Sequence, residues 1–210
     1  GTLRFETPTG EQFVRADAVI LALGGASWPQ LGSDAAWVRW LMGRGVKIAP
    51  LRPANCGFDL AWTPIMRQKF AGQPVKSVAM KLPTPSGGER WRQGEFLVTE
   101  TGIEGGVVYA FSSALRDAIE KKGTVTVYLD LTPDRDRARL ERELARPRGK
   151  RTMSTHLERQ VGISGVKAGL LRELVPKEDF ADPVKLAAAI KSVPLTLSAA
   201  RPIAEAISSA

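Results

Sequence analysis

The spacing of apolar and polar residues changes near residue 130. Before it, apolar residues alternate with polar ones or form short runs separated by Gly and Pro, as in strands and turns. After it, apolar residues recur every three or four positions, as in amphipathic helices. Thirteen of the fourteen aromatic residues precede this point, and Phe180 alone follows it. The pattern predicts an α+β fold whose strand-rich part comes first.

The first residues predict a hairpin and then a buried strand. Leu3 and Phe5 alternate with polar residues before a turn signal at Thr9–Gly10. The run Ala18–Leu23 is apolar throughout and ends at Gly24–Gly25. Such a run is typical of a strand covered on both faces, as in a parallel α/β sheet. A helix is predicted over about 34–44, with Ser33 or Asp34 as its cap, Trp37 and Trp40 on its apolar face and Gly45 at its end.

The middle of the chain predicts a small barrel or a strongly curved sheet, because it reads as short strands with frequent turns. Strands are expected near 46–51, 56–60, 75–82, 93–99, 106–112 and 124–130, and short helices near 63–70 and 113–122. A loop between two of the strands is marked by Pro83, Pro85, Gly87 and Gly88.

The helical part looks like an insertion. Helices are expected over about 134–145, from a cap at Ser154, over about 164–174 and from Pro183. The stretch Pro194–Leu197 then returns to a strand pattern. The helices would therefore interrupt the strand-rich part.

Composition limits the classes of function. With 43% hydrophobic and 25% charged residues, the chain is an ordinary globular protein rather than a disordered one. One cysteine, Cys56, excludes an internal disulfide and fits a reducing compartment, so we expect the cytoplasm. With a single histidine, His156, a zinc site of Cys and His ligands is excluded, and no metal is expected. We expect Cys56 to be a buried structural thiol and His156 to be exposed or capping. No apolar run is long enough to span a membrane.

The net charge of +8 raises the question of a polyanionic partner. Eight basic residues lie in the run Arg135–Arg151. This run could contact nucleic acid or an anionic surface, or it could be a solvated helix face with intrahelical ion pairs. No aromatic residue interleaves the charges, so stacking of bases is not supported. We therefore expect no nucleic-acid partner.

The strongest candidate site is the turn after the apolar run. Glycines without Cβ atoms let the backbone approach a ligand, and amide groups there can face a phosphate or ribose. The candidate residues are Ala22, Leu23, Gly24, Gly25, Ala26 and Ser27. The alternative is a tight strand-to-loop turn with no ligand. The full dinucleotide fingerprint Gly-x-Gly-x-x-Gly does not occur in the sequence.

Four stretches resemble the YhiN/BaiN-like flavoproteins, also called the aminoacetone oxidase family of NAD(P)/FAD-dependent oxidoreductases. They are ALGGASWPQLGSD, PLRPANCGFDL, GEFLVTETGIEGGVVYAFS and the helical stretch after LDLTPD. The resemblance implies a split FAD domain that carries a six-stranded β-barrel insert, itself interrupted by a helical bundle. It also implies that further flavin-binding segments lie upstream and downstream, so we expect an internal fragment.

On this resemblance residues 1–46 belong to the edge of a Rossmann-like FAD-binding domain, to which 201–210 begins to return. The β-barrel-like insert covers 47–130 and 194–200, and the helical subdomain covers 131–193. The implied function is FAD-dependent oxidation or reduction of a small-molecule substrate, with NAD(P)H as a candidate electron donor and the insert covering the flavin. The alternatives are a basic nucleic-acid- or anion-binding module and a structural interaction domain.

The chain departs from the family pattern at two places. A Gly-Ser-Thr-Gly-Asp-Gly-like stretch is replaced by Gly32–Trp37. In a Thr-His-x-Gly-x-Ser-Gly-Pro stretch the His, Ser and Pro are replaced by Glu100, Glu104 and Gly106. The resemblance therefore names no catalytic residue. The glycines Gly102, Gly105 and Gly106 either approach a flavin or substrate or only shape turns.

Overall fold

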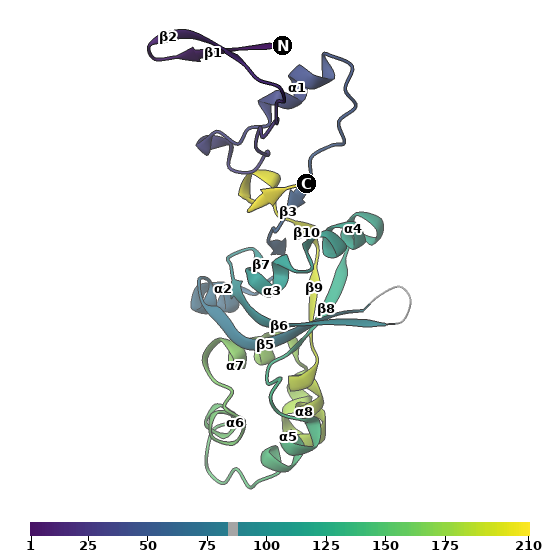
Figure 1. The fold of residues 1–210 in the computed structure, drawn as a ribbon. Coiled ribbons are helices and arrows are strands. Elements are labelled where there is room, and N and C mark those ends of the chain that lie inside the picture. The colour runs from purple at the N-terminus through teal and green to yellow at the C-terminus, as the bar shows by residue number, and fades with distance from the viewer. Residues whose placement is uncertain (84–87) are drawn as a thin grey trace.

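One antiparallel sheet of seven strands forms the centre of the computed structural model, which describes residues 1–83 and 88–210 (Figure 1). From edge to edge its strands are β10 (Ala199–Ala200), β4 (Phe58–Asp59), β7 (Gly102–Glu104), β6 (Glu89–Val98), β5 (Pro74–Pro83), β8 (Val125–Asp130) and β9 (Val193–Leu197). The edge strands β9 and β10 are separated in sequence by Ser198 alone. The sheet must therefore curl strongly, because its two edges are consecutive pieces of chain.

The curvature agrees with the predicted curved sheet, whereas a closed six-stranded barrel is not shown. Strand pairing among the described residues leaves the sheet open. The long strands β5 and β6 pair over most of their length, with an irregularity between Val75 and Val78. Ser77, inside it, has a φ of 51°, a left-handed conformation that bends the strand. Of the predicted loop between these strands, Pro85 and Gly87 lie outside the described residues.

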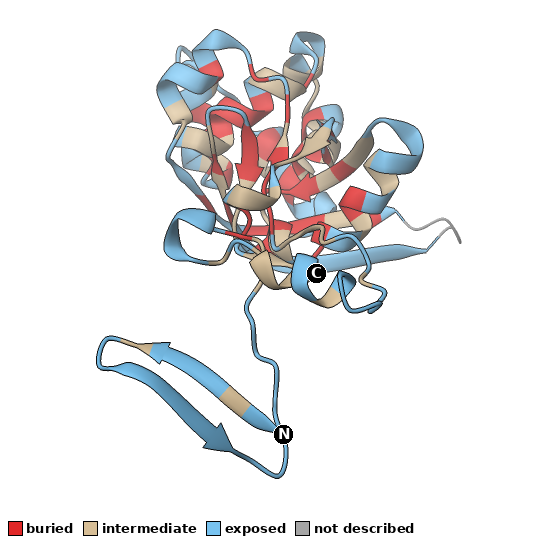
Figure 2. Cartoon of the chain, turned by 90° about the horizontal axis from the view of Figure 1, so that it is seen from above, coloured by how far each residue is buried: buried red, intermediate tan, exposed pale blue. Residues whose placement is uncertain are grey.

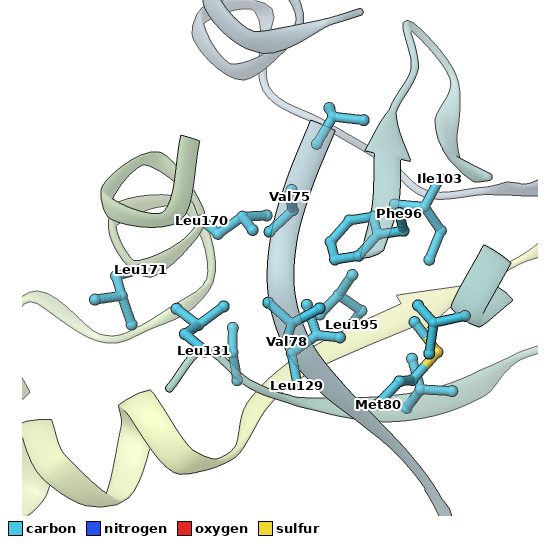
Figure 3. Close-up of a cluster of buried hydrophobic side chains, with 14 of the residues drawn as sticks. Val75, Val78, Met80, Phe96, Ile103, Leu129, Leu131, Leu170, Leu171 and Leu195 are labelled. Carbon is cyan, nitrogen blue, oxygen red and sulfur yellow. The ribbon is translucent and has the colours of Figure 1, made fainter. Parts of the chain in front are cut away.

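The core lies on and between these strands. The buried side chains Val78, Met80, Phe96, Leu129 and Leu195 meet from four strands, and Leu170 and Leu171 approach them from a helix (Figure 3). Each fully buried side chain of this size contributes about 1.5–3 kcal/mol relative to an exposed one. The helices α2 (Pro64–Phe70), α3 (Gly106–Tyr109) and α4 (Ser112–Lys122) complete this part of the molecule. The predicted helices 63–70 and 113–122 are confirmed as α2 and α4.

The helical part is an insertion between β8 and β9, as predicted. Its elements are α5 (Arg137–Leu144), α6 (Met153–Val161), α7 (Gly165–Leu174), the 3₁₀ helix η2 (Lys177–Ala181) and α8 (Pro183–Lys191). The insertion starts and ends on paired strands, since Leu129 lies opposite Val193. The cap of α6 is Thr152, whose hydroxyl accepts from the Thr155 N–H at 3.2 Å, and not the predicted Ser154.

Two half-buried lysines attach the insertion to the sheet. The Lys191 ammonium bonds the buried Asp130 carboxylate and the Arg135 carbonyl, the latter at 2.7 Å. The Lys167 ammonium donates to the carbonyls of Ser77 at 2.9 Å and Leu131 at 2.7 Å. Burial lowers the pKa of Lys167, which nearby carboxylates partly restore. The Lys167 bond to Ser77 fixes the insertion against the irregular part of β5, and the Lys191 bond to Asp130 fixes it to β8.

Two predicted strands of the middle region do not form. Residues 106–112 hold α3 and the start of α4, because Gly105 has a φ of 104° and directs the chain into a helix. Short apolar runs do not distinguish a buried strand from a buried helix. Residues 46–51 form no strand, and pairing begins only at β3 (Pro53–Ala54), which meets β11 (Ser208–Ser209).

The first fifty residues contain the predicted hairpin, β1 (Thr2–Thr7) with β2 (Gly10–Arg15), which lies apart from the rest and is exposed (Figure 2). They also contain the 3₁₀ helix η1 (Pro29–Leu31) and α1 (Ala36–Met42), which falls within the predicted helix but ends at Gly43. Trp40, predicted on the apolar face of this helix, is 62% exposed in the part of the chain that the structure describes.

The predicted buried strand Ala18–Leu23 is also wrong. The segment forms neither a strand nor a helix, and Ile20 is 90% exposed. A strand inside a parallel sheet also needs hydrogen-bonded strands along its edges. None of the described strands pairs with this segment. Separately, none of the described helices combines the length and apolar character required to cross a bilayer.

Candidate functional site

The candidate loop Ala22–Ser27 is fixed by residues from the other end of the sequence. The Ala26 N–H donates to the Ser209 hydroxyl at 2.9 Å. Beside it, the Trp28 N–H donates to the Ala204 carbonyl at 3.4 Å. Ser209 belongs to β11, and Ala204 to the 3₁₀ helix η3 (Ile203–Glu205). The structure thus joins the first and last segments of the chain at this loop.

The two glycines of the loop have different uses. Gly24 has a φ of 77°, which favours glycine. Gly25 allows a close approach, because a Cβ there would lie 2.3 Å from the Ser209 hydroxyl oxygen. Both carbonyls are bonded: that of Gly24 accepts from the Trp37 indole at 3.1 Å, and that of Gly25 from the Ala35 N–H at 3.0 Å.

The amide groups of these glycines are the hydrogen-bond donors that the loop offers to a ligand. Within residues 1–83 and 88–210, the N–H groups of Gly24 and Gly25 donate to no protein acceptor. Successive N–H groups that remain free in a glycine turn form a concave donor site for an anion or a sugar oxygen. The loop therefore has the donor set that the backbone-contact hypothesis requires.

The structure does not treat the six candidate residues alike. Ala22 and Leu23 are exposed, Gly25 and Ala26 are half-buried, and Ser27 is buried. An apolar hollow of about 390 Å³ begins beside Ala26. Its other lining residues include Ala35, Val38, Met42, Ile48 and Ile203. A ligand at the loop would have donors on one side and an apolar surface on the other.

Sequence reasoning missed Ser209 and its neighbours. In the same last segment of the chain, Arg201 binds the Asp59 carboxylate at 3.1 Å and the Glu205 carboxylate at 2.7 Å. The hydrogen bonds that Arg201 donates to the Glu205 carboxylate raise the pKa of Arg201. This pairing holds the last segment to β4. No local sequence pattern could have predicted the contact between Ser209 and Ala26, because the two residues are 183 positions apart.

The second glycine-rich segment serves the packing of the sheet. A Cβ on Gly102 would lie 1.9 Å from the Phe58 carbonyl oxygen, so only glycine lets β7 lie against β4. A Cβ on Gly105 would lie 3.3 Å from the Phe96 Cα. These contacts favour the turn-shaping interpretation for Gly102 and Gly105.

Cys56 and His156 are both buried, which was expected for Cys56 but not for His156. Cys56 is 1% exposed, and burial raises the pKa of its thiol, which keeps it protonated and inert. His156 is 4% exposed, so the expected exposed or capping role is wrong. Its Nε2 lies 3.0 Å from the Leu144 carbonyl oxygen, which holds the ring inside the helical part. Among the described residues, no group of three or more His, Cys, Asp or Glu side chains could hold a metal.

Comparison with known proteins identifies the family. The model of the HI0933-like protein barrel and H2TH domain matches residues 52–208, about three quarters of the chain. That match covers the curved sheet, the helical insertion and the return to Ser208. A search of curated proteins found no match. The chain therefore belongs to the HI0933-like family of flavoprotein oxidoreductases.

Proposed function

We propose that this chain is the central part of an FAD-dependent oxidoreductase and that the loop Ala22–Ser27 contacts the cofactor through its backbone. The observation that carries the proposal is the pair of N–H groups at Gly24 and Gly25, which have no acceptor among the described residues, in a loop held by Ser209. A bound FAD would supply hydride or electron-pair transfer at its N5 atom, while the protein binds, orients and shields it.

The proposal assigns successive parts of the chain to different domains. Residues 1–46 and 201–210 belong to a Rossmann-like FAD domain, and residues 47–130 with 194–200 form the barrel-like insert. Residues 131–193 form the helical subdomain. In this arrangement the insert covers the reactive face of the flavin and shapes the site of a small-molecule substrate. NAD(P)H is the proposed electron donor and the cytoplasm the proposed location.

The loop fits a dinucleotide in its donors and its surface. Free amides suit a pyrophosphate or ribose oxygen, and the neighbouring hollow suits an uncharged ring. The Gly-x-Gly-x-x-Gly fingerprint that normally binds the pyrophosphate does not occur in these 210 residues. We therefore expect that the 210-residue chain alone does not hold FAD stoichiometrically.

The test is flavin occupancy of the product of the complete gene, measured by its absorbance after gel filtration. Gly24→Val should lower FAD affinity about tenfold, because a Cβ at this φ distorts the turn and misplaces one donor. Gly94→Ala in β6 is the matched control, since its Cβ would meet only Val107, at an ordinary 3.5 Å. A product without flavin, or equal FAD affinity in Gly24→Val and the parent, would refute the proposal.

A further inference from the structure

A second cavity, of about 810 Å³, lies wholly within the helical insertion. Every residue that lines it falls between Leu144 and Leu186, on or beside α5, α6, α7, η2 and α8. Its apolar lining includes Leu144, Met153, Val175, Phe180 and Leu186. A volume of this order is typical of sites that enclose a small organic molecule.

Four cations share this cavity with the apolar side chains. They are Arg146, Arg148, Arg172 and Lys177, and none of the described residues that line the cavity is acidic. Arg146 donates to the Gln160 side chain at 3.2 Å, and Arg172 donates to the Ser154 hydroxyl. Within residues 1–83 and 88–210, none of the four forms an ion pair with a carboxylate.

The neighbouring arginines show that this lack of pairing is local. On α5, Arg137 binds Glu141 at 2.8 Å and Arg139 binds Glu143 at 2.9 Å. Arg135, just before α5, also binds Glu143. The basic run therefore divides into a first half whose arginines pair with carboxylates and a second half from which Arg146 and Arg148 line the cavity. Like charges held together repel, and a bound anion would relieve that repulsion.

His156 adds one polar position to the cavity wall. A carbonyl oxygen only accepts, so the 3.0 Å contact with Leu144 requires a hydrogen on Nε2. In the neutral ring Nδ1 is then an acceptor, and within the described structure it has no partner. The hydrogen bond to the backbone of α5 thus fixes the orientation of the imidazole ring.

We propose that this cavity binds an amphipathic organic anion, namely a carboxylate carried on an apolar body. The body would lie against Phe180, Met153 and Leu186. The carboxylate would bind at the opening, where an arginine can present two parallel N–H groups to its two oxygens. A neutral apolar ligand would leave the four charges uncompensated. A nucleic acid would find beside them, among the described lining residues, one half-buried phenylalanine, Phe180, which is little surface for the stacking of bases. The inference does not depend on the proposed flavin function.

Calorimetric titration of the 210-residue chain with octanoate and with 1-octanol tests the proposal. The two probes have the same apolar chain and differ in charge. Octanoate should bind about tenfold or more tightly than 1-octanol, and its affinity should fall with salt. Equal affinities for the two probes, or no binding of either, would overturn the proposal.

Substitutions then locate the site. The double variant Arg148→Gln/Lys177→Gln should weaken octanoate binding about tenfold and leave 1-octanol binding unchanged. Arg137→Gln is the control, because it removes a charge from the same run at a residue that is paired and outside the cavity. An equal loss in the control would show that only overall charge matters and would contradict the site.

A second measurement does not depend on variants that fold. In methyl-labelled protein, octanoate should shift the Met153 methyl resonance and leave that of Met80, in the sheet core, unchanged. Titration with a single-stranded oligonucleotide tests nucleic acid as the alternative ligand. Tight, salt-steep oligonucleotide binding that is lost in the double variant, with no shift of Met153 by octanoate, would assign the charges to nucleic acid instead.

Discussion

Residues 1–50 and residues 52–208 contain similar apolar stretches but differ in what they bury. In the first segment Ser27 is the one residue that is buried, within the part of the chain that the structure describes. In the second, the strands and helices enclose a continuous core that includes Leu129, Leu157 and Leu195, each at 0% exposure. The contrast shows that an apolar run predicts a tendency to be covered, whereas coverage itself needs neighbours.

The two strand-like runs make the point directly. Strand β8 is flanked by β5 and β9, which pair with it on both sides. The run Ala18–Leu23 has no strand beside it among the described residues. The first segment is instead attached through a few polar contacts, such as that between Ala26 and Ser209. Substitutions in the two segments should therefore have unequal effects.

The largest difference is expected between Leu129→Ala and Ile20→Ala. Leu129 is fully buried, so its truncation should lower the free energy of unfolding by about 2–5 kcal/mol. Ile20 is 90% exposed, so the same truncation should change it by less than about 0.5 kcal/mol. Urea unfolding followed by far-UV circular dichroism measures both. Equal losses would mean that the first segment is buried in solution.

A smaller effect is expected where backbones approach each other in the sheet. Gly102→Ala should lower the free energy of unfolding by about 1–3 kcal/mol, because the new Cβ would meet the Phe58 carbonyl and push β7 from β4. Gly94→Ala has space and should change it by less than about 1 kcal/mol. The urea midpoints of the two variants provide the comparison. If Gly102→Ala matched Gly94→Ala, the close approach of β4 and β7 would be wrong.

The smallest effect concerns ion pairs. Hydrogen bonds from Arg139, and the nearby charge of Arg135, lower the pKa of Glu143. The ionised form is thus favoured in the folded state. The ionised Glu143 carboxylate stabilises the folded protein fully at pH values above the usual glutamate pKa of 4.5. This stabilisation is lost as the pH falls through the lowered pKa of Glu143 in the folded protein. Glu143→Gln should cost about 1 kcal/mol at neutral pH and progressively less in acid.

The exposed pair of Arg4 and Glu6 on the hairpin is the matched comparison. Their atoms are 3.7 Å apart and both side chains are more than half exposed, so Glu6→Gln should have no measurable effect. Urea titrations from neutral to acidic pH follow both variants. A loss for Glu143→Gln that does not shrink in acid would exclude the ionic explanation.

The sequence predicted those elements that carry their own signals. Helix α8 begins at Pro183 and is capped by Asp182, and the hairpin β5–β6 has long runs of strand-forming residues. The segment Gly106–Phe111 was predicted as a strand because Val107, Val108 and Tyr109 favour strands, but the φ of Gly105 and burial against β6 decide otherwise. Local preference could not overcome that context.

The candidate site was predictable in part for the same reason. The glycine turn at Gly24–Gly25 is local and visible in the sequence, whereas its clamp by Ser209 is not. Two of the cations of the helical cavity, Arg146 and Arg148, lie in an obvious basic run, yet only the fold brings Phe180 and Leu186 beside them. Sequence shows which residues have a chemical capacity, and tertiary structure decides which of them meet.

The pairing of β8 with β9 has a consequence for how the chain folds during synthesis. Sixty-two residues separate Asp130 from Val193, so β8 leaves the ribosome long before its partner. Until then the edge of β8 that β9 will cover is free to pair with another chain, a known route to aggregation. Prior folding of the helical insertion would bring its two ends together and shorten the effective loop that β9 must close. We therefore expect the insertion to act as an internal guide that protects the nascent sheet.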